Sequence, residues 1–150
     1  MNFQLSCSIV LFKNNVNVLE RTLNCVLDAS LRIKIYLIDN SPTDSLRILA
    51  KTQNVEYIFN GKNLGYGKAH NIALRQSIKD RIKYHLILNP DVVFESKIMP
   101  VIYSYMEKNE EIGLLMPKIF YENGSLQKLC KLLPSPVDLF VRRFLSGSNW

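Results

Sequence analysis

Three short polar segments directly follow apolar runs and carry side chains that could bind a ligand. The first begins at Asp39, which comes after Leu37 and Ile38. Its carboxylate could accept a hydrogen bond from the ring N–H of a base or from a ribose hydroxyl. Alternatively, Asp39, Asn40 and Ser41 only cap a helix that follows them, since these residue types are good helix N-caps. The pattern alone favours neither interpretation.

The second segment is a glycine-rich loop over residues 61–67. Backbone N–H groups of such a loop can approach a phosphate where a helix begins. The loop is not a P-loop, because five residues instead of four separate its first and last glycines, and Ala69 instead of Ser or Thr follows Lys68. It is not a Rossmann fingerprint either, since His70 stands where a third glycine is needed. A plain turn is an equally good interpretation.

The third segment is Asn89-Pro90-Asp91, after the apolar run at 84–88. Pro90 ends strand pairing, because it has no N–H to donate. A carboxylate placed there can bind Mg²⁺ or Mn²⁺ through one oxygen, while diphosphate oxygens and water fill the other positions of the cation. Such a cation neutralises charge that develops on a departing diphosphate. The alternative is an ordinary turn, since Asn, Pro and Asp all favour turns.

Strands and amphipathic helices alternate along the chain and would position these three segments. Asn17, with Glu20 three positions later, indicates a capping box, and Ser41 with Pro42 indicates another helix start. The alternation implies an α/β fold, in which helices cover a mainly parallel sheet and ligands bind beyond the carboxyl ends of the strands. The pattern predicts strands at 5–12, 33–38, 55–59, 84–88 and 112–116, and helices at 17–29, 68–79 and 96–108.

The pattern changes after Pro117. Asn123-Gly124, between the segments 118–121 and 125–127, predicts a β-hairpin. A last amphipathic stretch at 137–145 is basic, and such a helix can lie on an anionic membrane surface. The alternative is that it packs against further parts of the protein.

Composition excludes several classes of protein. Hydrophobic residues make up 47% and charged residues 21% of the 150-residue chain, which is ordinary for a globular domain. The net charge of +6 favours anionic partners without choosing among them. No apolar run approaches the ~18 residues of a membrane-spanning helix. Because the first residues do not resemble a secretory signal and the three cysteines lie far apart, we expect reduced thiols and a cytoplasmic location.

Taken together, the segments resemble the glycosyltransferase family 2 domain, which has the GT-A (Rossmann-like) fold, and in particular its bacterial rhamnosyltransferase-like members. The resemblance covers roughly residues 6–130. It extends to residues 113–118, which are similar to the segment after the metal motif. The matching motifs are Ser8-Ile9-Val10-Leu11-Phe12-Lys13-Asn14, Leu37-Ile38-Asp39-Asn40-Ser41, Asn63-Leu64-Gly65-Tyr66-Gly67-Lys68-Ala69-His70-Asn71 and Leu88-Asn89-Pro90-Asp91-Val92.

The resemblance implies which residues contact the nucleotide sugar. In the family, the end of the first strand lines the nucleoside, the acid after the second strand reads a pyrimidine base, and the glycine loop with its helix packs on the nucleotide. We therefore expect Asp39 to be incompletely buried, so that a base edge can reach it. The expected nucleotide-sugar-binding residues are Leu11, Phe12, Asp39, Asn63, Gly65, Lys68, Asn71, Asn89 and Asp91.

The metal motif departs from the family pattern. The family's Asp-x-Asp is Asn89-Pro90-Asp91 here, so an amide replaces the first acid. The resemblance implies that Asp91 alone keeps the metal role, with Mg²⁺ or Mn²⁺ as the cofactor.

A second departure concerns the general base. Family members use a carboxylate further along the chain to deprotonate the acceptor, and no acid after Asp91 matches that motif. We expect residues 1–130 to form the nucleotide-sugar-binding domain. Residues 131–150 would begin an acceptor-side or membrane-proximal segment of a truncated chain, without the base.

The implied function is inverting transfer of a sugar, with rhamnose as one candidate, from a UDP- or dTDP-linked donor. The acceptor would be a glycan or a lipid-linked glycan in cell-surface polysaccharide synthesis, at the inner face of the membrane. The alternative is a non-catalytic basic module that binds nucleotides or nucleic acid. Against nucleic acid, the aromatic residues are scattered through the strands and form no stacking platform among basic residues.

Overall fold

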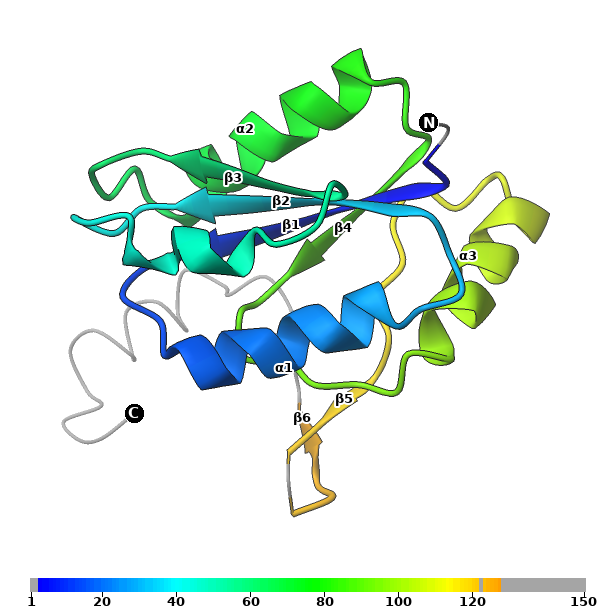
Figure 1. The fold of residues 1–150 in the computed structure, drawn as a ribbon. Helices are drawn as coiled ribbons and strands as arrows, with labels where there is room; N and C mark the ends of the chain where they lie inside the picture. The colour runs from blue at the N-terminus through cyan, green and yellow to red at the C-terminus, as the bar shows by residue number, and fades with distance from the viewer. Residues whose placement is uncertain (1–2, 122, 128–150) are drawn as a thin grey trace, which may run out of the picture. The chain divides into compact units, whose positions relative to one another are not determined.

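The computed structural model describes residues 3–121 and 123–127 (Figure 1). The chain divides into two compact units, Met1–Glu111 and a second unit that begins at Ile112. The predicted domain boundary after residue 130 and the amphipathic stretch at 137–145 lie outside the described residues.

The first unit is a parallel sheet covered by helices, which confirms the predicted α/β class. The strands β1 to β4 have the order β3-β2-β1-β4, and every neighbouring pair is parallel. Helices α1 and α2 cover opposite faces of this sheet (Figure 1). The elements are β1 (Leu5–Leu11), α1 (Val16–Leu27), β2 (Ile33–Asp39), the 3₁₀ helix η1 (Ser45–Leu49), β3 (Val55–Phe59), α2 (Tyr66–Lys79), β4 (Tyr84–Leu88) and α3 (Ile98–Lys108).

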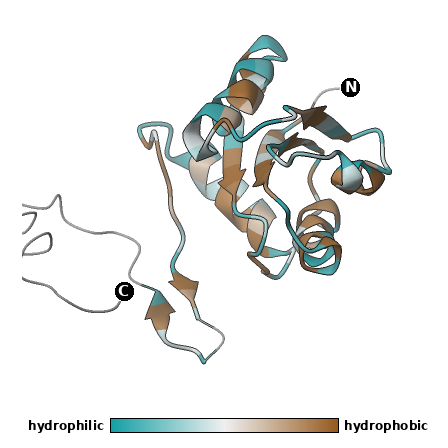
Figure 2. Ribbon diagram, turned by 90° about the vertical axis from the view of Figure 1, so that its left-hand side faces the viewer, coloured by the Kyte–Doolittle hydropathy of each residue, from teal (hydrophilic) through white to brown (hydrophobic). Residues whose placement is uncertain are grey.

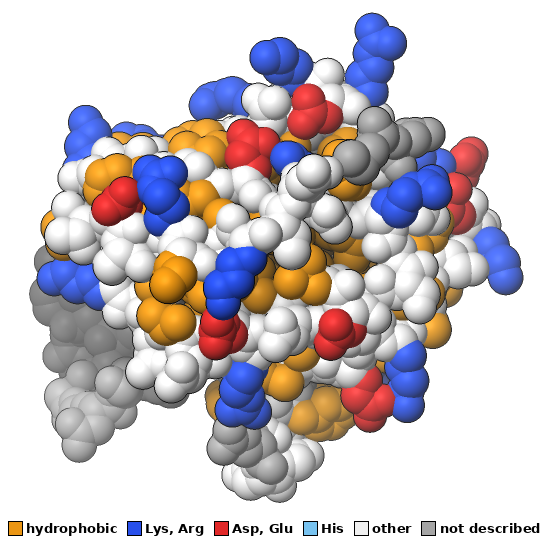
Figure 3. Space-filling model, in the orientation of Figure 1, with side chains coloured by type: hydrophobic (Ala, Val, Ile, Leu, Met, Phe, Trp, Pro, Cys, Tyr) orange, Lys and Arg blue, Asp and Glu red, His pale blue; other side chains and the backbone are white. Residues whose placement is uncertain are grey.

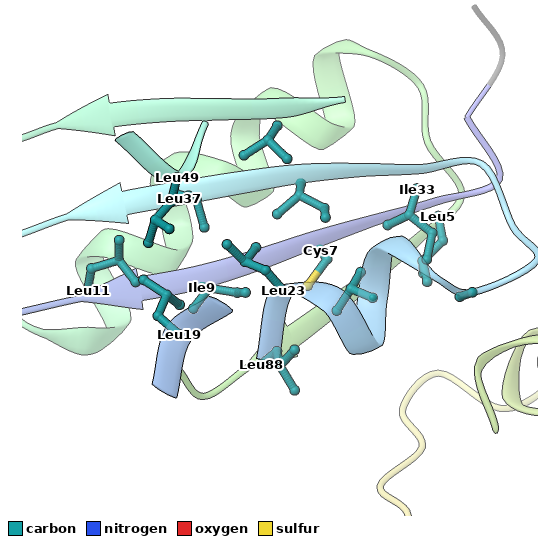
Figure 4. Close-up of a cluster of buried hydrophobic side chains, with 14 of the residues drawn as sticks. Leu5, Cys7, Ile9, Leu11, Leu19, Leu23, Ile33, Leu37, Leu49 and Leu88 are labelled. Carbon is teal, nitrogen blue, oxygen red and sulfur yellow. The ribbon is translucent and has the colours of Figure 1, made fainter. Parts of the chain in front are cut away.

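The core lies on both faces of the two central strands, and all seven residues of β1 are buried. In Figure 2 the hydrophobic colour accordingly gathers on the strands of the sheet. On the α2 face, Ala69 and Ala73 are fully buried against Val10, Tyr36 and Ile38. Buried residues of the α1 face include Leu5, Cys7, Ile9, Leu11, Leu19, Leu23, Ile33, Leu37, Leu49 and Leu88 (Figure 4). Burial of each of these leucine side chains away from water stabilises the fold by roughly 1.5–3 kcal/mol.

Two predicted helix starts are wrong. The N-cap of α1 is Asn15, whose Oδ1 accepts from the N–H of Asn17 at 2.9 Å and of Val18 at 3.4 Å, so Asn17 is not the capping residue. No helix begins at Ser41, because its Oγ accepts instead from the backbone N–H of Lys13 at 2.8 Å. The 3₁₀ helix starts only after Asp44.

The second unit contains the predicted hairpin but not the predicted strand at 112–116. Within the described residues this segment has no strand partner, and the side chain of Leu114 is 88% exposed, so an apolar pattern alone did not produce a strand. Strands β5 (Ile119–Phe120) and β6 (Leu126–Gln127) pair antiparallel. Gly124, in the turn, has φ of 80°, which favours glycine.

No helix among the described residues is long and apolar enough to cross a membrane.

Candidate functional site

An open pocket of about 720 Å³ lies in the first unit, where the strands end. Its volume is in the range of small-molecule and cofactor sites. All three polar segments singled out in the sequence contribute to it. The lining residues are Val10, Phe12, Asn14, Asn40, Asn63, Gly65, Tyr66, Asn89, Pro90 and Asp91.

The glycine loop enters the pocket with a fixed backbone. The N–H of Gly65 donates to Oδ1 of Asn63 at 2.9 Å, and Gly65 has φ of 81°. A Cβ added at Gly65 would meet nothing within 4 Å, so the backbone conformation, and not space, requires glycine here. Helix α2 begins directly after this residue, which directs the start of the helix toward the pocket.

Asn40 connects this loop to the ends of β2 and β3. The side chain of Asn40 is buried, and its Oδ1 accepts from Nδ2 of Asn60 at 2.9 Å. Its own Nδ2 donates to Oδ1 of Asn63 at 3.4 Å. This chain of amides holds the loop against the sheet. Of its three residues, only Asn63 was an expected nucleotide-sugar-binding residue.

The turn after β4 is held from two sides. On the pocket side, the hydroxyl of Tyr66 donates to Oδ1 of Asn89 at 2.9 Å. Burial raises the pKa of Tyr66, so this hydroxyl remains a donor at neutral pH. From α1, the hydroxyl of Thr22 donates to the carbonyl oxygen of Pro90 at 2.9 Å. The side chain of Asp91 is exposed and lines the pocket.

Asp39 is fully buried, so the expectation that it is incompletely buried is wrong. Its Oδ1 accepts from the backbone N–H of Ser41 at 2.8 Å, and its Oδ2 accepts from the hydroxyl of Tyr57. Burial, together with the bond to Asp39, raises the pKa of Tyr57 well above its usual value, which keeps the hydroxyl protonated. The carboxylate therefore supports the loop after β2 from behind the pocket.

The structure separates the expected site residues into two groups. Phe12, Asn63, Gly65, Asn89 and Asp91 line the pocket. The others lie elsewhere: Leu11 and Asp39 are buried, and Lys68 and Asn71 are exposed on α2. Sequence reasoning missed Asn14, Asn40 and Tyr66, although each stands within a quoted motif.

All the pocket residues lie within the part of the chain that matches a known family. Residues 7–140 match the family described as Glycosyl transferase family 2. The chain belongs to this family. The hexosyltransferase Agl10 of low-salt glycan biosynthesis from Haloferax volcanii is 26% identical over 92 residues, which cover 61% of this chain and 30% of Agl10. This chain thus spans less than a third of that relative's length.

The family's fold is also found in TarS of S. aureus. A TarS crystal structure matches 71% of this chain and 20% of its own, with 16% identity and a TM-score of 0.61. A second structure, of TarS 1-349, matches with the same score and covers 33% of its own chain. At this identity the likeness concerns the fold, and it confirms the predicted GT-A architecture.

Of the described side chains that line the pocket of this family 2 domain, only Asp91 is charged. Four of the others are asparagines. No cluster of three or more His, Cys, Asp or Glu side chains that could hold a metal occurs within the described part of the chain. One carboxylate is nevertheless enough for Mg²⁺, which proteins often bind through one or two carboxylates plus substrate phosphates. The metal-ligating side chains of the pocket thus fit a cation that binds together with a diphosphate.

A partly buried polar network lies between β1, β4 and α2. Oγ of Ser8 lies 2.7 Å from Nδ1 of His70 and 2.7 Å from Nε2 of His85. Oγ of Ser6 lies 2.7 Å from Nδ1 of His85. Burial lowers the pKa of both histidines to about 4, so both are neutral at pH 7. The ring of His70 contacts that of Tyr66 edge-on, with centroids 4.3 Å apart, which connects the network to a pocket residue.

Proposed function

We propose that this domain binds the nucleoside diphosphate part of a sugar donor in the pocket at the strand ends. The observation that carries the proposal is the convergence of the three polar segments on one cavity of suitable size. The family assignment supports a glycosyltransferase, in which the sugar leaves the diphosphate and passes to an acceptor hydroxyl with inversion.

The lining suggests how the two parts of the donor lie. Phe12 and Tyr66 have partly exposed rings that offer apolar contact to a base or ribose. Asn14, Asn40 and Asn63 bring amide groups to the lining, and amides can donate and accept hydrogen bonds. We place the diphosphate beside the turn of Asn89 and Asp91.

The electrostatics of the pocket favour a divalent cation. None of the described residues that line it is Lys or Arg, so a bound diphosphate would meet the negative charge of Asp91 without compensation. Mg²⁺ or Mn²⁺ held by Asp91 would supply that compensation and stabilise the departing diphosphate. Asn89, a neutral amide, contributes an oxygen or an N–H but no charge.

For the rest of the reaction, we propose a UDP- or dTDP-linked donor, with rhamnose as one candidate sugar. We propose that the acceptor is a glycan or a lipid-linked glycan in cell-surface polysaccharide synthesis, at the inner face of the membrane. Agl10, described as a glycan biosynthesis hexosyltransferase, supports the glycan acceptor. An inverting transfer also needs a base at the acceptor hydroxyl. Since Asp91 is the one carboxylate that the described residues bring to the pocket, we assign this unit to donor binding.

The competing function is a basic module that binds nucleic acid. Figure 3 shows Lys and Arg side chains dispersed among Asp and Glu on the face in view, instead of one continuous basic patch. Nucleic acid binding depends on such basic patches or grooves, so this face gives that function no support.

The test is a thermal-shift and calorimetry screen of UDP, dTDP, ADP and GDP, each with and without Mn²⁺. A ligand at a hundredfold excess over Kd stabilises the fold by about 2.7 kcal/mol, which is easily measured. We expect a pyrimidine nucleoside diphosphate with Mn²⁺ to give the largest shift, and Asn14→Ala to weaken its binding. Asn24→Ala, on the exposed surface of α1, is the matched control. Binding of single-stranded DNA in place of any nucleoside diphosphate would overturn the proposal.

A further inference from the structure

We propose that Thr22 is a positioning residue of the donor site, which fixes the turn that carries Asp91. The inference rests on the proposed function, because it takes Asp91 to face the cation and the diphosphate. Thr22 lies in α1, outside every motif that the sequence singled out.

The hydroxyl of Thr22 is committed to the turn after β4. The residue is fully buried, and its Oγ1 lies 2.9 Å from the carbonyl oxygen of Pro90 and 3.4 Å from that of Val18. A threonine within a helix commonly donates to the carbonyl four residues earlier, which here is that of Val18. Since the hydroxyl has one proton, the shorter contact takes it. The bond therefore joins α1 to the turn.

Two contacts from α1 bracket Asp91. Besides the bond of Thr22 to Pro90, the backbone N–H of Phe94 donates to Sγ of Cys25 at 3.5 Å. Thr22 and Cys25 are three residues apart and share one face of the helix. The segment from Pro90 to Phe94 is thus attached to α1 at both ends, with the exposed side chain of Asp91 between the attachments.

The carbonyl of Pro90 is the suitable point of attachment. Proline has no N–H, so this residue offers only its carbonyl oxygen for a backbone hydrogen bond. Asn89, on the other side of Pro90, is held across the pocket by Tyr66. Loss of the Thr22 bond releases the Pro90 end of this segment from α1, while the bonds of Tyr66 to Asn89 and of Phe94 to Cys25 persist. We therefore expect Asp91 to lose its fixed position.

The experiment compares Thr22→Val with Thr22→Ser in the 150-residue chain. Valine keeps the shape of the side chain and removes the hydroxyl, whereas serine keeps the hydroxyl. The readout is the ratio of the Kd values of UDP without and with Mn²⁺, beside the Kd of uridine. We expect Thr22→Val to lower that ratio about threefold to tenfold, the range of one hydrogen bond. The Kd of uridine should not change, and Thr22→Ser should keep the wild-type ratio.

Two further variants separate positioning from loss of stability. Ser77→Ala removes a buried hydroxyl of α2 that bonds to Ser6 at 2.7 Å, away from the turn, and should leave the ratio unchanged. Thr22→Ala is a second variant without the hydroxyl, for use if the valine variant does not fold. A wild-type ratio in the folded variants without the hydroxyl, or an equal fall in Ser77→Ala, would overturn the role of Thr22. If the wild-type chain binds neither UDP nor dTDP, the proposed function fails and the role of Thr22 with it.

Discussion

The hydroxyl of Tyr66 donates a hydrogen bond to Oδ1 of Asn89, with 2.9 Å between the two oxygens. This bond joins the first residue of α2 to the turn after β4, and both residues line the pocket. Because Oδ1 accepts from Tyr66, the two N–H groups of the Asn89 amide are left to donate elsewhere. An amide at this position therefore offers donors to an anionic ligand, and it avoids a second negative charge beside Asp91.

Removal of that hydroxyl should weaken donor binding without loss of the fold. Tyr66→Phe keeps the ring and its edge contact with His70 but frees Asn89. The side chain is 53% exposed, so little stability depends on it. We expect the Kd of the nucleoside diphosphate to rise about twofold to tenfold, as for one neutral hydrogen bond. Calorimetry checks this, and an unchanged Kd would contradict the role of the bond.

The metal requirement should depend on Asp91 more than on Asn89. A carboxylate supplies the charge that Mg²⁺ and Mn²⁺ prefer, whereas an amide oxygen is a neutral ligand. Asp91→Ala should therefore abolish the gain in nucleotide affinity on addition of Mn²⁺, and Asn89→Ala should keep most of it. Titrations with and without Mn²⁺ measure the gain, with Asn24→Ala as the control. An equal loss in both pocket variants would count against this order.

Substitution of Asp39 should reduce the stability of the domain. Asp39→Ala leaves the buried N–H of Ser41 and the partly buried hydroxyl of Tyr57 without their acceptor. Each unpaired group costs about 1–3 kcal/mol. Urea unfolding measures this loss, and Asp44→Ala, at an exposed carboxylate, is the control. If the carboxylate also reads the base, affinity in the folded fraction falls more than tenfold. Wild-type affinity would restrict Asp39 to support of the loop.

Acid should destabilise the domain through His70, which is buried, and His85, which is partly buried. Their pKa values are lowered to about 4 in the folded state, against about 6.5 in an unfolded chain. As the pH falls below 6.5, the unfolded state binds protons first, so the free energy of unfolding falls. The loss is at most about 1.4 kcal/mol per pH unit for each histidine, and it ends near the folded pKa. Urea unfolding at pH 7, 6 and 5 tests this, and a constant free energy would contradict it.

The sequence predicted the fold well because the first four strands are short apolar runs between clear breaks. Some of the pocket residues, such as Asn63 and Asp91, were expected from the sequence motifs, whereas Asn14, Asn40 and Tyr66 stand within the same motifs and were missed. The position of Asp39 was not predictable, because a carboxylate at a strand end can face a ligand or support a loop. Its contacts with the hydroxyl of Tyr57 and the N–H of Ser41 are visible only in the structure. Thr22 was not predicted for a different reason, since its hydrogen-bond partner, the carbonyl oxygen of Pro90, lies in a distant segment of the sequence.

The register of the sheet has a consequence for the order in which the chain folds. β1 lies between β2 and β4, and Leu5 pairs with both Ile33 and Tyr84. One edge of the first strand therefore stays open until β4 has been synthesised, and such non-local pairings slow folding. In the folded sheet, Oγ of Ser6 and Oγ of Ser8 each lie 2.7 Å from a ring nitrogen of His85 in β4. A shift of β4 by one residue would break both contacts, so the two serines favour the observed register of β4 against β1.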